Sequence, residues 1–593
     1  MCGIAGVMMS GGRPPDPAVL DRLTVALAHR GPDGIGRFTL PPVGLVHTRL
    51  AIVDLETGDQ PFYESGGAAL VANGEIYNDP ELRNQLRGVA FATASDCEVP
   101  LHLYCRDGNA FTEALRGMYA IAIYDPANCH LTLARDPFGI KPLYYVERPD
   151  GFAFASEPQA LIAAGLANRT LRAHARAELL QLKFTTGTAT IFSEIHRVLP
   201  GETLVMAGGR ITERSRRLPL SEGPPPAANY DDALRQLDKV LIDTVEHHLR
   251  ADVPYGLFLS GGIDSSTLAG LMARMAAQPL AAFTAGFPDS SAADESIDAE
   301  RVAKAVGAHH HVVGITEHDF WNEAPRVAAA LDDPTTDAAA LPTYLLAKAA
   351  KDHVKVVLTG EGGDEIFCGY SRYYRARRFW GMFARKARSR GEFDGFDRTG
   401  EVFGGWRDGL KLAEDQQARA DLTFVQTLQA VDCAEWLPND LLIKVDRCLM
   451  AHGLEGRTPF LDPVVADFAF RLPDDMKATT RMAKRMLRDW LAVNVPAAEP
   501  YARKLGFNPP VGEWIAARQP LIQKLVAAHP GIREIFSNDN VRTSVGWAFA
   551  DLKKRHQAAW SLLFYALWHS HHVLEIPSDG TIEDVLADAA AAG

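Results

Sequence analysis

Residues 255–266, YGLFLSGGIDSS, decide the fold of the larger part of the chain. The apolar run 255–259 predicts a buried strand, and it leads into a glycine-rich turn and a helical pattern from about Ser265. A second apolar run, 355–358, also leads into a glycine-rich turn, at residues 360–363. Because strand, turn and helix recur in this order, the sequence predicts a parallel α/β sheet, with mostly helical additions from about residue 370.

The turn after the first strand has the composition of a phosphate-binding site. Glycines let the backbone wrap around phosphate oxygens, serine hydroxyls donate hydrogen bonds, and the following helix N-terminus adds partial positive charge. Asp264 is a candidate ligand that would hold Mg²⁺ against those oxygens. The chain has no GxxxxGK[ST] motif, so this turn differs from the loop that cleaves a γ-phosphate.

The first 200 residues are β-rich by the same criteria. Short apolar runs are separated by turn residues, and the runs 144–146 and 152–154 flank a Pro-Asp-Gly hairpin turn. Helical patterns are fewer here, chiefly 17–29 and 156–164. We therefore expect an N-terminal domain over residues 2–205.

The boundary between the domains is marked by a change in composition. Residues 214–228, RSRRLPLSEGPPPAA, combine proline, glycine and charge without periodicity, which predicts a linker within 206–228. Beyond it, Asn229 is a candidate N-cap of a long helix. We expect a second domain over residues 229–580 and a flexible, acidic tail over 581–593.

Composition excludes several classes of protein. The 593 residues include 61 Lys and Arg against 74 Asp and Glu, a net charge of −13, which argues against a nucleic-acid-binding surface. No apolar run reaches the roughly 18 residues of a membrane span, and the N-terminus does not have the pattern of a signal peptide. Seven scattered cysteines without a CxxC motif predict a protein of the reducing cytoplasm without a cysteine-based zinc site.

Cys2 follows the initiator methionine directly. If Met1 is removed, Cys2 carries both a thiol and a free α-amine, whose ordinary pKa is about 7.7–8.0. One residue could then supply a nucleophile and its general base.

Four polar motifs follow Cys2: HRGPDG at 29–34, HTRLAIVD at 47–54, NGEIYN at 73–78 and SDCE at 95–98. An α-amino acid amide needs a cation for its carboxylate, an anion for its ammonium group and donors for the oxyanion formed on attack. Arg49 is a candidate for the first role and Asp96 with Glu75 for the second. Asn73 and the backbone amide of Gly74 are candidates for the third.

With MCGIAG at residues 1–6, these motifs resemble the class II glutamine amidotransferase domain, an N-terminal-nucleophile hydrolase, over roughly residues 2–200. The resemblance implies a four-layer αββα sandwich in which the cysteine thiolate attacks glutamine and releases ammonia. Its implied glutamine-binding residues are Arg49, Leu50, Ala51, Ile52, Val53, Asn73, Gly74, Glu75 and Asp96.

Three further segments accompany the phosphate-binding turn: TGEGGDEIF at 359–367, LEGRTPFLD at 454–462 and RMAKR at 481–485. Together they resemble the synthetase domain of the glutamine-hydrolysing asparagine synthetases, an ATP pyrophosphatase with a PP-loop, from about residue 230 to 570. The resemblance implies ATP and Mg²⁺ as cofactors, with Asp264 and Asp364 as Mg²⁺ ligands. Glu361 takes the position tied to the acyl-adenylate and its attack by ammonia, and Lys484 is a candidate for neutralising pyrophosphate. The implied ATP contacts are Leu259, Ser260, Gly261, Gly262, Asp264, Ser265, Ala285, Thr359, Gly360 and Lys484.

The acceptor segment departs from one branch of that family. Residues 333–342 read DPTTDAAALP, whereas that branch reads roughly D-V-T-T-I-R-A-S-T-P. Thr335 and Thr336 are retained as candidate acceptor-binding residues, but Asp337 and Ala338 stand where the branch has Ile-Arg. Other bacterial members also lack the arginine, and we therefore expect aspartate as the acceptor.

The sequence thus predicts a carbon–nitrogen ligase that makes asparagine through β-aspartyl-AMP, with AMP, pyrophosphate and glutamate as the other products. Its partners would be small-molecule substrates, without nucleic acid or membrane, and a homodimer is one option for its oligomeric state. Three alternatives stay open: a different carboxylate acceptor (a peptide or a secondary-metabolite precursor), thiolation of transfer RNA, or a catalytically inactive nutrient-binding regulator. The histidines at 309–311 and 569–572 are expected to be solvated or hydrogen-bonded rather than zinc ligands.

Overall fold

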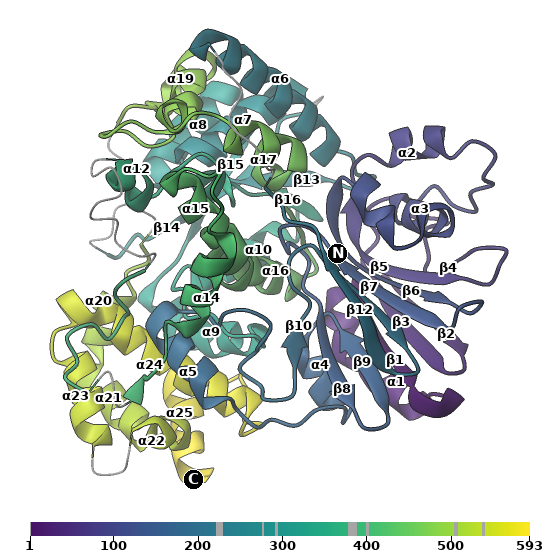
Figure 1. The fold of residues 1–593 in the computed structure, drawn as a ribbon. Coiled ribbons are helices and arrows are strands. Elements are labelled where there is room, and N and C mark those ends of the chain that lie inside the picture. The colour runs from purple at the N-terminus through teal and green to yellow at the C-terminus, as the bar shows by residue number, and fades with distance from the viewer. Residues whose placement is uncertain are drawn as a thin grey trace.

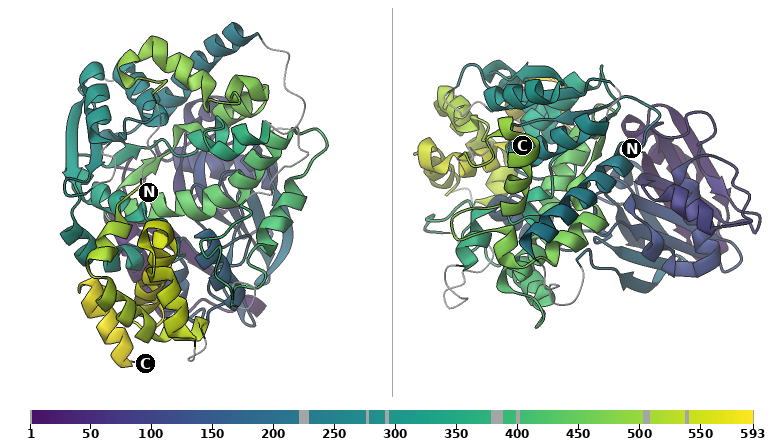
Figure 2. Two further views of the ribbon diagram at one scale, coloured as in Figure 1. Left: turned by 90° about the vertical axis from the view of Figure 1, so that its left-hand side faces the viewer. Right: turned by 90° about the horizontal axis from the view of Figure 1, so that it is seen from above.

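The computed structural model of the chain describes residues 2–220, 229–275, 278–290, 295–377, 388–398, 402–502, 508–536 and 540–592. Two lobes lie side by side, and the N-terminus lies at their junction (Figures 1 and 2). The N-terminal lobe contains two antiparallel sheets, and the C-terminal lobe contains one parallel sheet surrounded by helices. The predicted two-part α/β architecture is confirmed.

Each sheet of the N-terminal lobe has six strands whose neighbours run antiparallel. The first sheet consists, in spatial order, of β10 (His196–Arg197), β8 (Tyr144–Arg148), β9 (Gly151–Ala155), β1 (Gly3–Met9), β3 (Val43–Arg49) and β2 (Gly34–Leu40). The second consists of β12 (Arg210–Arg216), β11 (Glu202–Ala207), β7 (His130–Arg135), β6 (Gly117–Asp125), β5 (Ala69–Ile76) and β4 (Phe62–Tyr63).

Alternating side chains bury both faces of each sheet, which produces the predicted αββα sandwich. Ile4 and Met8 of β1 pack against the second sheet, whereas Ala5 and Val7 point to the opposite face. That outer face is covered by α1 (Pro17–Leu27) and α4 (Pro158–Ala163). The outer face of the second sheet is covered by α2 (Asp79–Gln85) and α3 (Val99–Asp107).

The predicted linker begins too early. β12 lies within residues 206–228 and pairs with β11 along its whole length. Its side chains are mostly exposed because it is the edge strand of its sheet, so its charged composition resembled that of a linker. The prediction is therefore wrong for residues 206–216, and residues 221–228 lie outside the described part of the chain.

The sheet of the C-terminal lobe consists of β15 (His309–Gly314), β14 (Ala281–Gly286), β13 (Tyr255–Phe258), β16 (Val356–Leu358) and β17 (Glu455–Arg457), all parallel. The predicted strand–turn–helix units are both present. β13 leads into α7 (Ile263–Met275), and β16 leads into the short α11 (Gly363–Ile366). The predicted N-cap is also present, because Asn229 accepts a hydrogen bond at the start of α6 (Tyr230–His248). Both glycine-rich turns thus lie at the carboxyl ends of adjacent strands, where open α/β sheets bind ligands.

The tail predicted over residues 581–593 is wrong, because Ile582–Ala592 form a helix, α25. Ile582, Val585, Leu586 and Ala589 are buried against α9 (Glu317–Ala330), α21 (Gln519–Ala528) and α24 (Leu552–His572). Their spacing gives the helix one apolar face, which the acidic, alanine-rich composition concealed. Gly593 lies outside the described residues.

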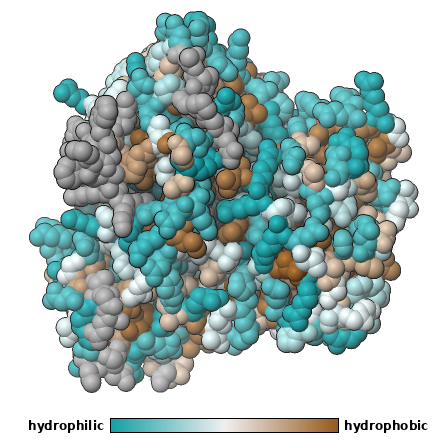
Figure 3. Space-filling model, viewed as in Figure 1, coloured by the Kyte–Doolittle hydropathy of each residue, from teal (hydrophilic) through white to brown (hydrophobic). Residues whose placement is uncertain are grey.

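The histidine clusters lie apart from both glycine-rich turns. His309, His310 and His311 lie on β15, the edge strand, and His569 and His572 are buried in α24. Within the part of the chain that the structure describes, no three metal-ligating side chains converge and no helix has the length and apolarity to cross a membrane. The face seen in Figure 3 is mostly hydrophilic, with hydrophobic residues in small groups.

Because the apolar face of α25 is buried, shortening a side chain on it should lower the stability of the protein. Leu586→Ala should lower the free energy of unfolding of the C-terminal lobe by about 2–4 kcal/mol, because it leaves a cavity beneath the helix. Leu521→Ala on α21 is the control, since Leu521 is 43% exposed. Urea denaturation compares the two variants, and equal midpoints would show that α25 does not contribute to the folded core.

Candidate functional site

Cys2 lies directly before β1 and is buried. Its backbone nitrogen donates a hydrogen bond to Asn73 Oδ1 at 3.0 Å, and burial raises the pKa of its thiol. Asn73 is on β5, and its Nδ2 is buried without a partner among the described residues. Gly74 approaches β6 so closely that an added Cβ would lie 2.4 Å from the Met118 carbonyl oxygen. The unpaired Nδ2 of Asn73 is therefore held next to Cys2, the predicted nucleophile.

The other residues predicted to bind glutamine surround this position, but several have protein partners. The Arg49 guanidinium lies 2.7 Å from Asp59 Oδ1 and also donates to the Asp54 carbonyl oxygen. Asp96 accepts a hydrogen bond from the backbone nitrogen of Ile76, and burial raises the pKa of Asp96 to about 6.

Two contacts in this region come from the C-terminal lobe. Glu75 Oε2 lies 3.1 Å from Arg457 Nη2, and burial raises the pKa of Glu75. The loop after β3, which contains Leu50, Ala51, Ile52 and Val53, is held by Asp33, whose Oδ2 accepts from the Ala51 nitrogen and from Lys355 Nζ. The predicted glutamine site is therefore partly enclosed by the second lobe.

Arg30, in the HRGPDG motif, connects Cys2 to the C-terminal lobe. Its guanidinium is fully buried and donates through Nε to the Cys2 carbonyl oxygen at 3.1 Å. Nη1 and Nη2 lie 2.8 and 3.0 Å from the two carboxylate oxygens of Asp446, on α16 (Ile443–Met450). Nη1 also lies 2.7 Å from Glu157 Oε1 in its own lobe.

The pairing continues through Arg447, the next residue of α16. Arg447 Nη1 lies 2.8 Å from Asp446 Oδ2, and Nε lies 2.7 Å from Asp332 Oδ1. We refer to Arg30, Glu157, Asp332, Asp446 and Arg447 as the interlobe charge network. Its members are all buried, and each has at least one oppositely charged partner in the network.

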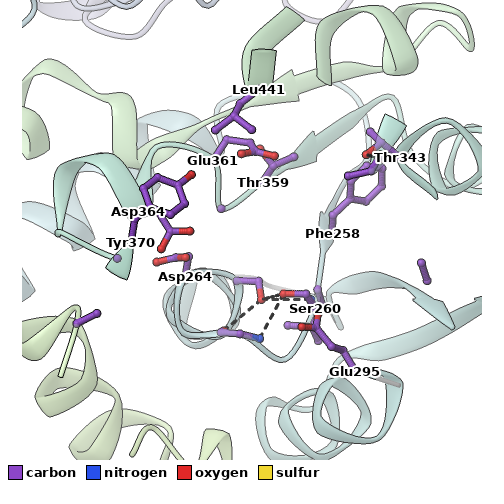
Figure 4. A pocket seen from close by; sticks show the side chains of 18 of the residues that line it. Phe258, Ser260, Asp264, Glu295, Thr343, Thr359, Glu361, Asp364, Tyr370 and Leu441 are labelled. Carbon is purple, nitrogen blue, oxygen red and sulfur yellow. Dashed lines mark hydrogen bonds between the residues drawn. The ribbon is translucent and has the colours of Figure 1, made fainter. Parts of the chain in front are cut away.

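The second predicted site is a cavity of about 1050 Å³ at the carboxyl ends of β13, β14 and β16. It brings together ten of the residues that the sequence singled out: Leu259, Ser260, Gly262, Asp264, Ser265, Ala285, Thr359, Gly360, Glu361 and Asp364. Within the turn, the Gly262 nitrogen donates to Ser260 Oγ at 3.3 Å, and the Ser260 nitrogen donates to Ser265 Oγ at 3.2 Å (Figure 4).

Two carboxylates and one ammonium group converge at this turn. Asp264 and Asp364 lie side by side in Figure 4, and Lys484 Nζ pairs with both, at 2.6 Å from Asp364 Oδ1. Asp264 Oδ1 is buried and has no hydrogen-bond partner among the described residues. Gly369 is required here, because a Cβ would lie 1.7 Å from Asp364 Oδ1. Paired carboxylates with an unsatisfied oxygen are a donor set that fits Mg²⁺.

Lys484 has a strained backbone. It precedes α19 (Arg485–Asn494) with φ of +53°, in the left-handed region that non-glycine residues rarely adopt. Such strain costs of order 1–3 kcal/mol and is typical of functional positions. In this conformation the Lys484 ammonium group is held between the two carboxylates.

The acceptor residues predicted from the sequence do not line the cavity. Thr335 and Thr336 are fully buried. Thr335 donates to Asp440 Oδ1, and the Thr336 hydroxyl lies 3.1 Å from Ser561 Oγ. The next residue, Asp337, does line the cavity, and so does Lys444 of α16. Segment 333–342 therefore does contribute to the cavity wall, but through Asp337, a residue that departs from the other branch.

No sequence motif indicated a functional role for five residues of these two regions: Arg30, Asp337, Lys444, Asp446 and Arg447. One signal was present in residues 443–450, IKVDRCLM, where three charged residues interrupt an apolar helical segment. Charges on a helix that is otherwise buried indicate pairing across an interface. Their partners are up to 416 residues away in the sequence, and no local pattern identifies them.

Comparisons with known proteins identify the family of the chain. A family model described as asparagine synthase matches residues 236–570, and one described as a glutamine amidotransferase domain matches residues 1–216. The chain belongs to the asparagine synthase family. The amidotransferase match ends with β12, the last strand of the N-terminal sheets, and the asparagine synthase match begins within α6.

Three individual relatives support the assignment of the chain to this family. A Bacillus subtilis (strain 168) protein named asparagine synthetase [glutamine-hydrolyzing] 1 is 30% identical, over 97% of this chain and 97% of the relative. Asparagine synthetase B [glutamine-hydrolyzing] of Escherichia coli (strain K12) is 30% identical, over 85% of this chain and 83% of the relative. A Penicillium rubens protein named amidase chyE is 33% identical, over 63% of this chain and 60% of the relative.

The interlobe charge network predicts a large effect of one substitution. Asp446→Ala should lower the free energy of unfolding by about 3–5 kcal/mol, because it breaks a buried ion pair and removes the acceptor of buried N–H groups of both Arg30 and Arg447. Asp467→Ala is the control, since Asp467 forms a half-exposed pair with Arg471 worth about 1 kcal/mol or less. Urea denaturation measures both, and similar small losses would contradict the role assigned to Asp446.

Proposed function

We propose that this enzyme makes asparagine from aspartate, with ATP as the energy source and glutamine as the ammonia donor. The observation that carries the proposal is the presence of both half-sites in one chain, with Arg30 joining Cys2 to α16 beside the ATP-type cavity. The printed names of the B. subtilis and E. coli relatives support the same overall reaction. We place the enzyme in the cytoplasm, acting on small-molecule substrates.

The first half-reaction takes place at Cys2. Once Met1 is removed, the nitrogen held by Asn73 Oδ1 is an amine, and it accepts the thiol proton. The thiolate attacks the side-chain amide carbon of glutamine, and Asn73 Nδ2 with the Gly74 nitrogen donates to the oxyanion. The protonated α-amine gives its proton to the leaving nitrogen as the carbon–nitrogen bond breaks, so that ammonia is released. Water then hydrolyses the thioester, which gives glutamate and restores the thiol.

Glutamine would be recognised by groups around this nucleophile. Arg49 would bind its carboxylate, and Asp96 with Glu75 would bind its ammonium group. The loop after β3 would form the remaining wall, through Leu50, Ala51, Ile52 and Val53.

The second half-reaction takes place in the cavity. Ser260, Gly261, Gly262 and Ser265 would hold the phosphates of ATP, with Leu259, Ala285, Thr359 and Gly360 around the nucleotide. A carboxylate oxygen of the acceptor attacks the α-phosphorus, and the bond to the β-phosphate oxygen breaks to release pyrophosphate. Lys484 neutralises the charge of this leaving group.

Asp264 and Asp364 would hold Mg²⁺, which neutralises phosphate charge when bound. Ammonia then attacks the acyl carbon of β-aspartyl-AMP, and AMP leaves. Glu361 would take up the proton that ammonia loses. Burial raises the pKa of Glu361, which favours its binding of that proton.

The two half-reactions share ammonia, which would be protonated and diluted if released to water. We propose that ammonia passes between the lobes without leaving the protein. The buried interlobe charge network supports this, since it keeps the lobes in contact next to Cys2.

A second candidate function is amidation of a different carboxylate. It is favoured by Ala338, which stands in place of the arginine of one family branch, and by a relative named as an amidase. Pyrophosphate release assayed against a panel of acids separates the two candidates.

The phosphate site predicts the products of ATP cleavage. Chromatography should detect AMP and pyrophosphate, and Asp264→Asn or Asp364→Asn should lower kcat by about 100-fold or more through weakened Mg²⁺ binding. Asp467→Asn is a control, because Asp467 pairs with Arg471 at an exposed position of the same lobe. Formation of ADP and phosphate would exclude this mechanism.

The separation of the half-sites predicts the behaviour of Cys2→Ala. Glutamine-dependent synthesis should disappear, whereas synthesis from added ammonium should continue near the parent rate, because the phosphate turn, Glu361 and Lys484 are unchanged. Cys129→Ala, at an exposed cysteine, is the matched control. Loss of ammonium-dependent synthesis in a folded Cys2→Ala protein would contradict the assignment.

A further inference from the structure

An ion pair lines the cavity next to Glu361. Asp337 Oδ2 lies 2.9 Å from Lys444 Nζ, and Lys444 Nζ lies 4.0 Å from Glu361 Oε1. Both members line the same cavity as the phosphate turn. The Lys444 side chain is only 6% exposed and that of Asp337 20%, so the pair is desolvated on most sides and accessible from the cavity.

The pair is held in position by the surrounding backbone. The Ala339 nitrogen donates to Asp337 Oδ1 at 3.1 Å, and the Asp337 nitrogen donates to Thr335 Oγ1 at 3.2 Å. Thr335 is in turn anchored on Asp440. This gives Thr335 a positioning role beneath the cavity wall. Lys444 is fixed by α16, which is itself paired to the N-terminal lobe through Asp446.

A buried ion pair that faces a cavity is complementary to a ligand that carries both charges. An α-amino acid places an ammonium group and a carboxylate on one carbon atom, at a separation that matches two adjacent, opposite side-chain charges. Each ligand charge then gains a charge-assisted hydrogen bond, and the four charges alternate in sign. A ligand with only one of these charges would leave one member of the pair uncompensated.

Arg481 also lines the cavity, in the same RMAKR segment as Lys484, and two further cations beside the cavity have partners of their own. Lys484 is held by Asp264 and Asp364 at the phosphate turn. Arg488 donates to the carbonyl oxygens of Ala483 and Pro500. Lys444 is the cation placed beside Glu361, where the acyl group would react, and it comes from a different segment than Ala338.

We infer that Asp337 and Lys444 form the acceptor clamp: Asp337 binds the α-ammonium group of aspartate, and Lys444 binds its α-carboxylate. The β-carboxylate is then left to face Glu361 and the α-phosphate. Lys444 thereby supplies the positive charge that position 338 lacks. This inference rests on the proposed function and names the residues that select its acceptor.

Two analogues test the two charges separately. Succinate lacks the ammonium group of aspartate, and β-alanine lacks its α-carboxylate. Both serve as competitive inhibitors of aspartate-dependent pyrophosphate release by the full-length enzyme with ammonium as nitrogen donor. Asp337→Asn should raise KM for aspartate and Ki for β-alanine by roughly 10- to 100-fold, without raising Ki for succinate. Lys444→Gln should raise KM for aspartate and Ki for succinate by a similar factor, without raising Ki for β-alanine.

Controls separate binding from folding. Lys348→Gln is matched to Lys444→Gln, because Lys348 pairs with Glu323 at an exposed position of the same lobe. The double variant Asp337→Asn/Lys444→Gln removes both charges together, so no unpaired charge is left buried. Glutamine hydrolysis at Cys2 and the thermal midpoint report whether each variant is folded, and KM for ATP should stay unchanged.

The outcomes distinguish the clamp from the reaction it serves. If the parent enzyme releases no pyrophosphate with aspartate but does so with another acid, the proposed function fails. If the parent uses aspartate and the folded variants change all three constants equally, or none of them, the clamp is wrong. The crossed pattern of inhibition supports the clamp.

Discussion

The buried guanidinium of Arg30 constrains the whole structure, because it donates at once to the Cys2 backbone and to the carboxylate of Asp446. A charge taken out of water is tolerated only where its partners are correctly placed. Arg30 therefore requires α16 to lie at one position relative to β1. The lobes cannot separate or slide there without breaking the two buried hydrogen bonds between Arg30 and Asp446.

Helix α16 transmits this constraint to the second site. Asp446 and Arg447 pair within the interlobe charge network, whereas Lys444, less than one turn away, faces the cavity beside Glu361. A displacement of the helix would thus alter contacts at both sites. Under the proposed function, α16 connects the two half-reactions, because the helix that pairs with Arg30 next to Cys2 also forms part of the cavity wall.

The sequence predicted what depends on contiguous residues. The strand, turn and helix from residue 255, the N-cap at Asn229 and the hairpin at residues 149–151 are local patterns, and the structure contains each of them. Edge strand β12 and helix α25 were missed because their composition resembled that of a linker and a tail, and only packing reveals their role. Arg30–Asp446 and Asp337–Lys444 were missed for a different reason. The members of these pairs are 416 and 107 residues apart in the sequence, so no local pattern identifies them. They become buried and paired only when the chain folds.

In the proposed function, ammonia released at Cys2 is used at Glu361 without reaching the solvent. The test uses glutamine labelled with ¹⁵N in its side-chain amide. It is supplied at saturation together with excess unlabelled ammonium, at a concentration that supports synthesis when glutamine is absent. Mass spectrometry of the asparagine formed gives the ¹⁵N content of its amide. If ammonia passes between the lobes inside the protein, the amide of the product retains nearly all of the label. A product whose label falls to the ¹⁵N fraction of the free ammonium would contradict it.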